Sequence, residues 1–202
     1  MEFLTLMALL LGGAYVFKTR EQQRRIALLG AALGKYQIEQ LMEKLIDGYL
    51  RWLGEDDAAR REQIWGLLGS TEQSLASQFG SFAADFAKVP APQAQVSKLP
   101  FTIPFAQPLL PGTRLFDVRR AFAIHARGIE AGAQNAQQLA PKAKAFMMTA
   151  ELLLMQHSCH WFCRSKTVAS ARLLARHKTP YAQVLDAVSA QTRRDYLALV
   201  GG

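Results

Sequence analysis

The N-terminus carries a fifteen-residue segment, Phe3 to Phe17, that contains no charged side chain. As an α-helix it would be about 22 Å long, which falls short of the roughly 30 Å hydrocarbon core of a bilayer. Long basic side chains directly after it can reach toward lipid headgroups, so a short membrane span is still feasible. We therefore predict a membrane anchor over residues 1–19. Its basic flank consists of Lys18, Arg20, Arg24 and Arg25.

The order of charges around this segment distinguishes an anchor from a secretory signal peptide. A signal peptide has basic residues before its apolar stretch and a small-x-small cleavage site after it, whereas here Glu2 precedes the stretch and Tyr-Val-Phe-Lys ends it. Because positive charge stays on the cytoplasmic side, we expect a single-pass protein of the inner (plasma) membrane with its N-terminus outside. The alternative is a helix buried in the protein's own core or in a homo-oligomer, since fifteen residues lie below the usual threshold of about 18.

The remaining residues, 20–202, are predicted to form a single all-α domain. Apolar residues recur at helical spacing from Arg20 to Leu53 and again over 57–88, which predicts a helical hairpin over 20–88 with Gly54 at the turn. Further helices are expected at about 114–138, 141–178, 180–188 and 189–199. No alternating strand pattern is present. The anchor helix would thus run into a bundle-like domain of five to six helices, completed by C-terminal helices over 114–200.

A proline-rich connector, residues 89–113, separates the hairpin from the C-terminal helices. Residues 90–111 hold six of the eight prolines, and proline cannot donate a hydrogen bond to a helix or a central strand. We expect an extended connector, in part a polyproline II helix. It also contains apolar residues such as Phe101 and Ile103 that a solvated linker would not need. We therefore expect it to pack across the helices, with docking of a partner as the alternative.

Four residues within one predicted helix, together with a fifth from the preceding one, belong to types that bind metals. They are His157, Cys159, His160 and Cys163, with His125 as the added ligand. Imidazole and thiolate bind zinc, copper or haem iron. The spacing matches neither the Cys-x-x-Cys-His haem motif nor the His-Glu-x-x-His zinc motif. The helix is apolar almost all round, which favours packing in the core. We predict no cofactor and keep a metal- or haem-binding sensor or redox protein as the alternative.

The net charge of +8 resides in residues 114–202, which carry thirteen Lys and Arg against five acidic residues. Arg164, Arg172, Arg176 and Lys178 spread over about 160° of a helix, as on an ordinary solvated face, and Lys166 points elsewhere. Aromatic residues do not interleave with them, which disfavours nucleic-acid binding. Anionic lipid headgroups fit better, because an anchor would hold this surface near the bilayer.

No catalytic constellation is evident in the sequence. It contains no glycine-rich phosphate loop, no Gly-x-Ser-x-Gly elbow and no pair of carboxylates on an apolar face. We therefore predict a protein that is not an enzyme: a membrane-anchored interaction or scaffold protein that holds a protein partner at the inner face of the membrane. The alternatives are the metal or haem protein described above and a basic nucleic-acid-binding protein.

Overall fold

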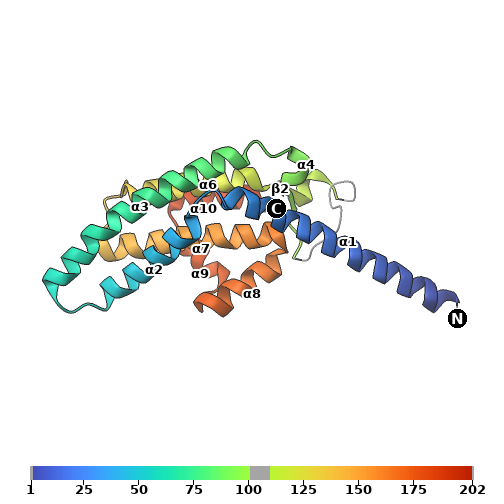
Figure 1. Ribbon diagram of the computed structural model, residues 1–202, viewed down its shortest axis with the longest axis horizontal. Helices are drawn as coiled ribbons and strands as arrows, with labels where there is room; N and C mark the ends of the chain where they lie inside the picture. Colours follow the sequence, from blue (N-terminus) through green and yellow to red (C-terminus); the bar gives the residue numbers. More distant parts are fainter. Residues whose placement is uncertain (1, 101–109, 202) are drawn as a thin grey trace.

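The computed structural model describes residues 2–100 and 110–201, and helices predominate among them (Figure 1). The prediction of an all-α, bundle-like fold is therefore confirmed at this level. The long helices are α1 (Glu2–Leu33), α2 (Ile38–Leu53), α3 (Ala58–Phe86), α6 (Val118–Ala133) and α7 (Pro141–Cys163). The shorter elements are α4 (Ala91–Ala94), β1 (Gln95–Ser97), η1 (Gly112–Arg114), β2 (Leu115–Asp117), α8 (Lys166–His177), α9 (Tyr181–Ala187) and α10 (Ala190–Val200).

Helix α1 continues without a break from the apolar segment into the body of the protein. Its C-terminal half packs against α7 and α3, whereas its N-terminal half projects from one end of the body (Figure 1). No helix in residues 2–100 or 110–201 is both long enough and apolar enough to cross a membrane. The anchor predicted over residues 1–19 is thus not found as a membrane span among the described residues.

The helix expected from Arg20 to Leu53 is divided in two, which corrects the sequence prediction. The chain turns at residues 34–37, and α3 supplies partners for the turn. The hydroxyl of Tyr36 donates to Asp85 over 2.9 Å, and the backbone N–H of Gln37 donates to the side chain of Gln78 over 2.7 Å. Contacts with a distant helix therefore stabilise this break.

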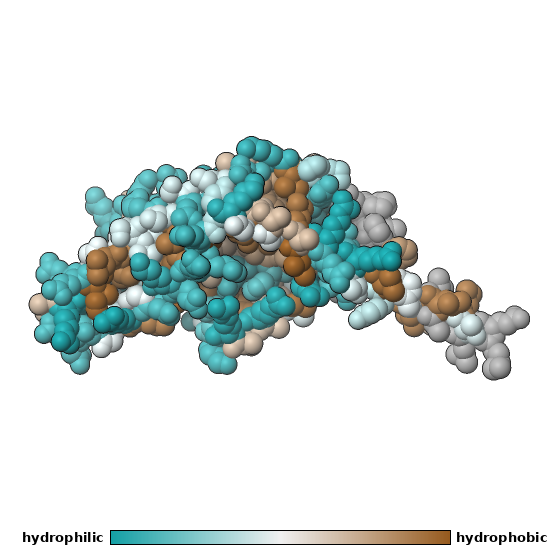
Figure 2. Space-filling view, viewed as in Figure 1, coloured by the Kyte–Doolittle hydropathy of each residue, from teal (hydrophilic) through white to brown (hydrophobic). Residues whose placement is uncertain are grey.

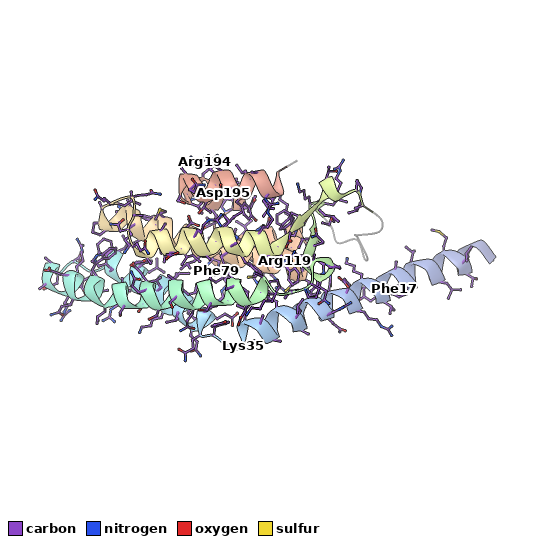
Figure 3. The ribbon with its side chains drawn as sticks, turned by 90° about the horizontal axis from the view of Figure 1, so that it is seen from above. Phe17, Lys35, Phe79, Arg119, Arg194 and Asp195 are labelled. Carbon is purple, nitrogen blue, oxygen red and sulfur yellow. The ribbon has the colours of Figure 1, made fainter. Side chains whose placement is uncertain are left out.

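Helices α2 and α3 form the predicted hairpin. Asp57 caps α3, because its carboxylate accepts a hydrogen bond from the Arg60 N–H over 2.9 Å. Farther along α3, the ring of Phe79 faces α6 and lies 6.4 Å from that of Phe122 (Figure 3). The core is aromatic at this point, and the hairpin packs on α6 and α7 through it.

A small antiparallel sheet, which was not predicted from the sequence, joins the connector to the segment that follows it: β1 lies within the connector, and β2 lies at the start of the segment expected to be helical from 114. Strand β1 pairs with β2 so that Val96 stands opposite Phe116, and both side chains are buried. The indole N–H of Trp161 donates to the carbonyl of Ser97 over 3.0 Å and ties the sheet to α7. The connector thus packs on the helices, as expected, over its described part. Residues 101–109, with Phe101 and Ile103, lie outside the described residues.

The helix expected over 141–178 is also divided, because the chain leaves the helical path at Arg164. Ser165 then caps α8 by accepting from the Val168 N–H. Helix α6 begins later than the predicted start near 114, and Asp117 is its N-cap. The last two helices follow the prediction closely, and Ser189 caps α10.

Candidate functional site

The large side chains described in the apolar segment of α1 are exposed on most sides of the helix. Seven of its large side chains have exposed fractions between 44% and 70%. They occupy most sides of the helix, since successive residues are rotated by about 100°. Figure 2 shows hydrophobic side chains along the projecting helix, and Figure 3 shows Phe17 outside the body. These described side chains are therefore largely exposed and do not belong to the core cluster. The seven are Leu6, Met7, Leu9, Leu11, Tyr15, Val16 and Phe17.

The four basic residues after the segment do not have the same surroundings. Arg25 is mostly buried, with its guanidinium donating to the carbonyl oxygens of Phe162 (3.2 Å) and Gln95 (3.1 Å). It also pairs with Glu21 over 2.9 Å. Lys18, Arg20 and Arg24 are exposed. Arg25 therefore fixes α1 to the body, and the other three form the basic flank that faces solvent.

Further basic residues lie at the end of the body from which α1 projects. The backbone N–H of Lys98 donates to the carbonyl of Arg114 over 2.9 Å, so these two residues are neighbours beside the small sheet. Two acidic residues near the base of the projecting helix are in ion pairs: Glu21 with Arg25 and Asp117 with Arg119. We call Lys18, Arg20, Arg24, Lys98 and Arg114 the basic collar.

The structure does not bring the five candidate metal ligands together. The Nε2 atom of His125 lies 2.8 Å from the Oγ atom of Ser158 inside the core. The Nε2 atom of His157 lies 3.0 Å from the Oγ atom of Ser170, and the His157 ring stacks on Tyr181. Within residues 2–100 and 110–201 no group of three or more His, Cys, Asp or Glu side chains is placed to hold a metal ion.

The acid–base properties of these residues fit burial in a core. Burial lowers the pKa of His125 and that of His157 to about 3, so both imidazoles are neutral at pH 7. Burial raises the pKa of the Cys163 thiol to about 11 and that of Cys159 still further. Both thiols are therefore protonated at neutral pH, and a protonated thiol is a poor metal ligand and a poor nucleophile.

A serine–histidine contact also exists, but no substrate can reach it. Ser158 contacts His125, Tyr196 and the carbonyl of Leu154, and both Ser158 and His125 are fully buried. The Nδ1 atom of His125 has no hydrogen-bond partner, so no carboxylate orients the ring. The arrangement contributes to core packing and lacks the geometry of a nucleophilic site.

The remaining three candidates, Cys159, His160 and Cys163, face a pocket of about 130 Å³ between α1, α2 and α7. A second pocket of about 400 Å³ continues along α2 toward α8. Both pockets are lined by Glu39, Met42 and Gln156, so they form one continuous depression, which we call the α2–α8 groove. This groove was not predicted from the sequence. Its one local signal is the four-residue repeat of Glu39, Glu43 and Asp47.

Several basic residues of the C-terminal half form ion pairs with acidic residues of the protein itself. Lys144 is buried and pairs with Glu72 of α3. Arg119 pairs with Asp117, and Arg193 pairs with Asp186 over 2.8 Å. These pairs reduce the free positive charge that a polyanion could contact.

Comparison of the chain with known protein families, with curated proteins and with solved structures found no match. The proposals below therefore rest on the geometry alone.

Proposed function

We propose that this protein is a membrane-anchored helical interaction or scaffold protein whose body lies on the cytoplasmic side. The observation that carries the proposal is the projecting, exposed apolar half of α1. Fully burying a large apolar side chain stabilises by about 1.5–3 kcal/mol, so covering seven of them is worth on the order of 10 kcal/mol. A free helix in water would forgo this energy.

A lipid environment suits this segment better than an oligomeric contact does. Helices that associate in water bury one apolar stripe and keep polar residues on the opposite face. The exposed residues here, from Leu6 to Phe17, leave no polar face. Lipid chains surround a helix on all sides, and mismatch between a 22 Å segment and the bilayer is accommodated by local thinning and by basic side chains that reach outward.

The basic collar supports both attachment and orientation. Each Lys or Arg near an anionic membrane surface contributes about 1 kcal/mol. Arg114 is exposed, and Lys98 donates from Nζ to the exposed carbonyl of Gly201 over 3.1 Å. Because the basic residues of α1 follow its apolar half directly, the positive-inside rule favours a cytoplasmic body. A body held there meets a membrane-bound partner at a raised effective concentration.

Membrane fractionation of cells that express the full chain tests this proposal. We expect the protein to remain with membranes through high salt and alkaline carbonate. The variant Leu9→Asp/Leu11→Asp should move to the soluble fraction, because an aspartate at the centre of a span costs about 3 kcal/mol. The matched control is Leu67→Asp/Leu174→Asp, which changes two exposed leucines of the body and should stay with membranes. Release of the unaltered protein by carbonate, or equal behaviour of the two variants, would contradict the proposal.

A further inference from the structure

We infer that the α2–α8 groove binds an amphipathic helix of a partner protein, with a basic flank of that helix against α2 and an acidic flank against α8. The inference rests on the proposed function in one respect, namely that the body acts by protein–protein interaction. The inference specifies the surface to which the partner binds and the charges that the partner helix carries. Three features of the groove lead to it: two walls of opposite charge, an apolar floor and its length.

The wall formed by α2 is acidic. Glu39, Glu43 and Asp47 follow each other at four-residue spacing, which places them in a row on one face of the helix, and all three are exposed. The second pocket is lined by all three. In the described part of the chain none of these carboxylates is in an ion pair.

The opposite wall, formed by α8, is basic. Arg176 and His177 line the same pocket as the carboxylates. Arg172 lies one turn earlier on α8. His160 lines the first pocket, and its pKa is lowered by burial and, to a smaller extent, by the positive charges of Arg172 and Arg176. The charge of Arg172 therefore acts on a residue of the groove. Neither arginine is in an ion pair with a described residue. Opposite charges thus flank one groove without meeting across it.

The floor between the walls contains apolar residues. Met42 and Met155 line the first pocket beside Cys159, and Ile46 lines the second. Methionine side chains are flexible and polarisable, and they suit surfaces that receive the apolar stripe of another helix. The Oε1 atom of Gln156 accepts a hydrogen bond from the Nε2 atom of His177 over 3.0 Å, and Gln156 contributes a polar group to this floor.

The length of the groove favours a helix over a small zwitterionic molecule. The row from Glu39 to Asp47 extends over about 12 Å, since a helix rises about 1.5 Å per residue. A small molecule would reach one carboxylate and one arginine, whereas a helix of three to four turns presents side chains at the same four-residue spacing along the whole row. The groove therefore matches a partner helix with Lys or Arg on one flank and Asp or Glu on the other.

Synthetic peptides test the inference on the full chain in dodecyl maltoside micelles, with fluorescence anisotropy as the readout. The probe is a labelled fifteen-residue helix with a Leu/Met stripe, lysines on one flank and glutamates on the other. Two control peptides keep the stripe and carry lysine on both flanks or glutamate on both flanks. We expect the mixed peptide to bind at least about tenfold more tightly than either control, because like charges brought together across an interface are strongly unfavourable.

Charge-reversal variants locate the binding. Glu39→Lys/Glu43→Lys/Asp47→Lys and Arg172→Glu/Arg176→Glu should each weaken binding of the mixed peptide about tenfold. Combining the two sets should restore it, because the walls are again opposite in sign and the peptide can bind in the reverse direction. Asp56→Lys/Glu62→Lys/Glu130→Lys changes three exposed carboxylates outside the groove and should bind like the unaltered protein.

No binding of the mixed peptide, equal binding of all three peptides, or equal effects of the groove and control variants would overturn the inference. Each of these results is independent of membrane fractionation. A protein that leaves the membrane in carbonate but still binds the mixed peptide would refute the anchor and retain the groove. A protein that stays with membranes in carbonate but does not bind the mixed peptide would support the anchor and refute the proposed binding at the groove.

Discussion

The guanidinium of Arg25 donates a hydrogen bond to the carbonyl oxygen of Phe162 over 3.2 Å and thereby joins α1 to the C-terminal end of α7. A second bond to the carbonyl of Gln95 reaches the small sheet. The guanidinium also lies over the Phe162 ring at 5.4 Å from its centroid. One side chain thus links three elements near the point where α1 leaves the body.

Replacing Arg25 by alanine should lower the free energy of unfolding by about 1.5–3 kcal/mol, because two carbonyl acceptors lose a charged donor. Urea denaturation of the full chain in dodecyl maltoside, followed by tryptophan fluorescence, measures this. Arg24→Ala is the matched control, since Arg24 is exposed and surface substitutions change stability by less than about 0.5 kcal/mol. Equal stability of the two variants would show that Arg25 does not fix α1 to the body.

A second prediction concerns the buried charges between α3 and α7. Lys144 pairs with Glu72, which also accepts a hydrogen bond from the Tyr49 hydroxyl over 2.5 Å. Lys144→Met should cost about 3–5 kcal/mol, because it leaves a buried carboxylate without its cation. Lys144→Met/Glu72→Gln should cost less than the single change, since the amide is neutral and can still accept from Tyr49. The same urea titrations measure both.

The control for this pair is Lys142→Met, which removes an exposed lysine from the same turn of α7. A Lys144→Met variant as stable as this control would mean that the ion pair is not formed. A double variant less stable than Lys144→Met would mean that Glu72 does not depend on the lysine charge.

The third prediction concerns pH. Burial, followed by the charges of Lys166 and His160, lowers the pKa of His157 to about 3 from its ordinary 6.5. The unfolded chain therefore takes up this proton first, and stability falls as pH drops from 6.5 toward 3, by about 1.4 kcal/mol per pH unit for this residue. His125 behaves in the same way. His157→Gln keeps a partner for Ser170 and should reduce the slope between pH 4 and 6 by that amount.

Free energies of unfolding at several pH values between 4 and 7 measure this slope. His177→Gln is the comparison, because His177 is only half-buried and should contribute less. If His157→Gln left the slope unchanged, His157 would not be held neutral in the folded protein.

Helices with strong local signals could be predicted from the sequence. The helix expected over 57–88 was found as α3, with Asp57 at its cap, and the helix after Ser189 was found as α10. In these segments the apolar spacing and the capping residue indicate the same boundaries. The breaks at residues 34–37 and at Arg164 could not be predicted, because partners such as Asp85 and Gln78, distant in sequence, hold the first of them.

The sheet and the groove were missed for a related reason. Strands of three residues are too short to show a period of two, and Val96 meets Phe116 only through long-range pairing. The row of Glu39, Glu43 and Asp47 is typical of a solvated helix face when it is considered alone. It becomes one wall of a groove because α8, more than 100 residues later, places Arg176 opposite it.

The candidate metal ligands illustrate the limit of spacing arguments within one helix. Cys159, His160 and Cys163 do face one pocket, as neighbouring positions on a helix can. His157 instead faces Ser170 and Tyr181 on α8 and α9. The neighbours on each side of α7 determine where each side chain lies, and those neighbours are set by the tertiary fold.

The central claim is that the N-terminal half of α1 lies in the lipid bilayer, and the depth of a probe on that helix tests it most directly. The full chain would carry Leu9→Cys in a Cys159→Ala/Cys163→Ala background, labelled with the fluorophore NBD and reconstituted into vesicles of phosphatidylcholine and phosphatidylglycerol. The control carries the label at Leu67→Cys, an exposed position on the body. We expect blue-shifted emission and quenching by lipids spin-labelled on the acyl chain at position 9, and neither effect at position 67. Equal emission and equal quenching at the two positions would contradict the claim.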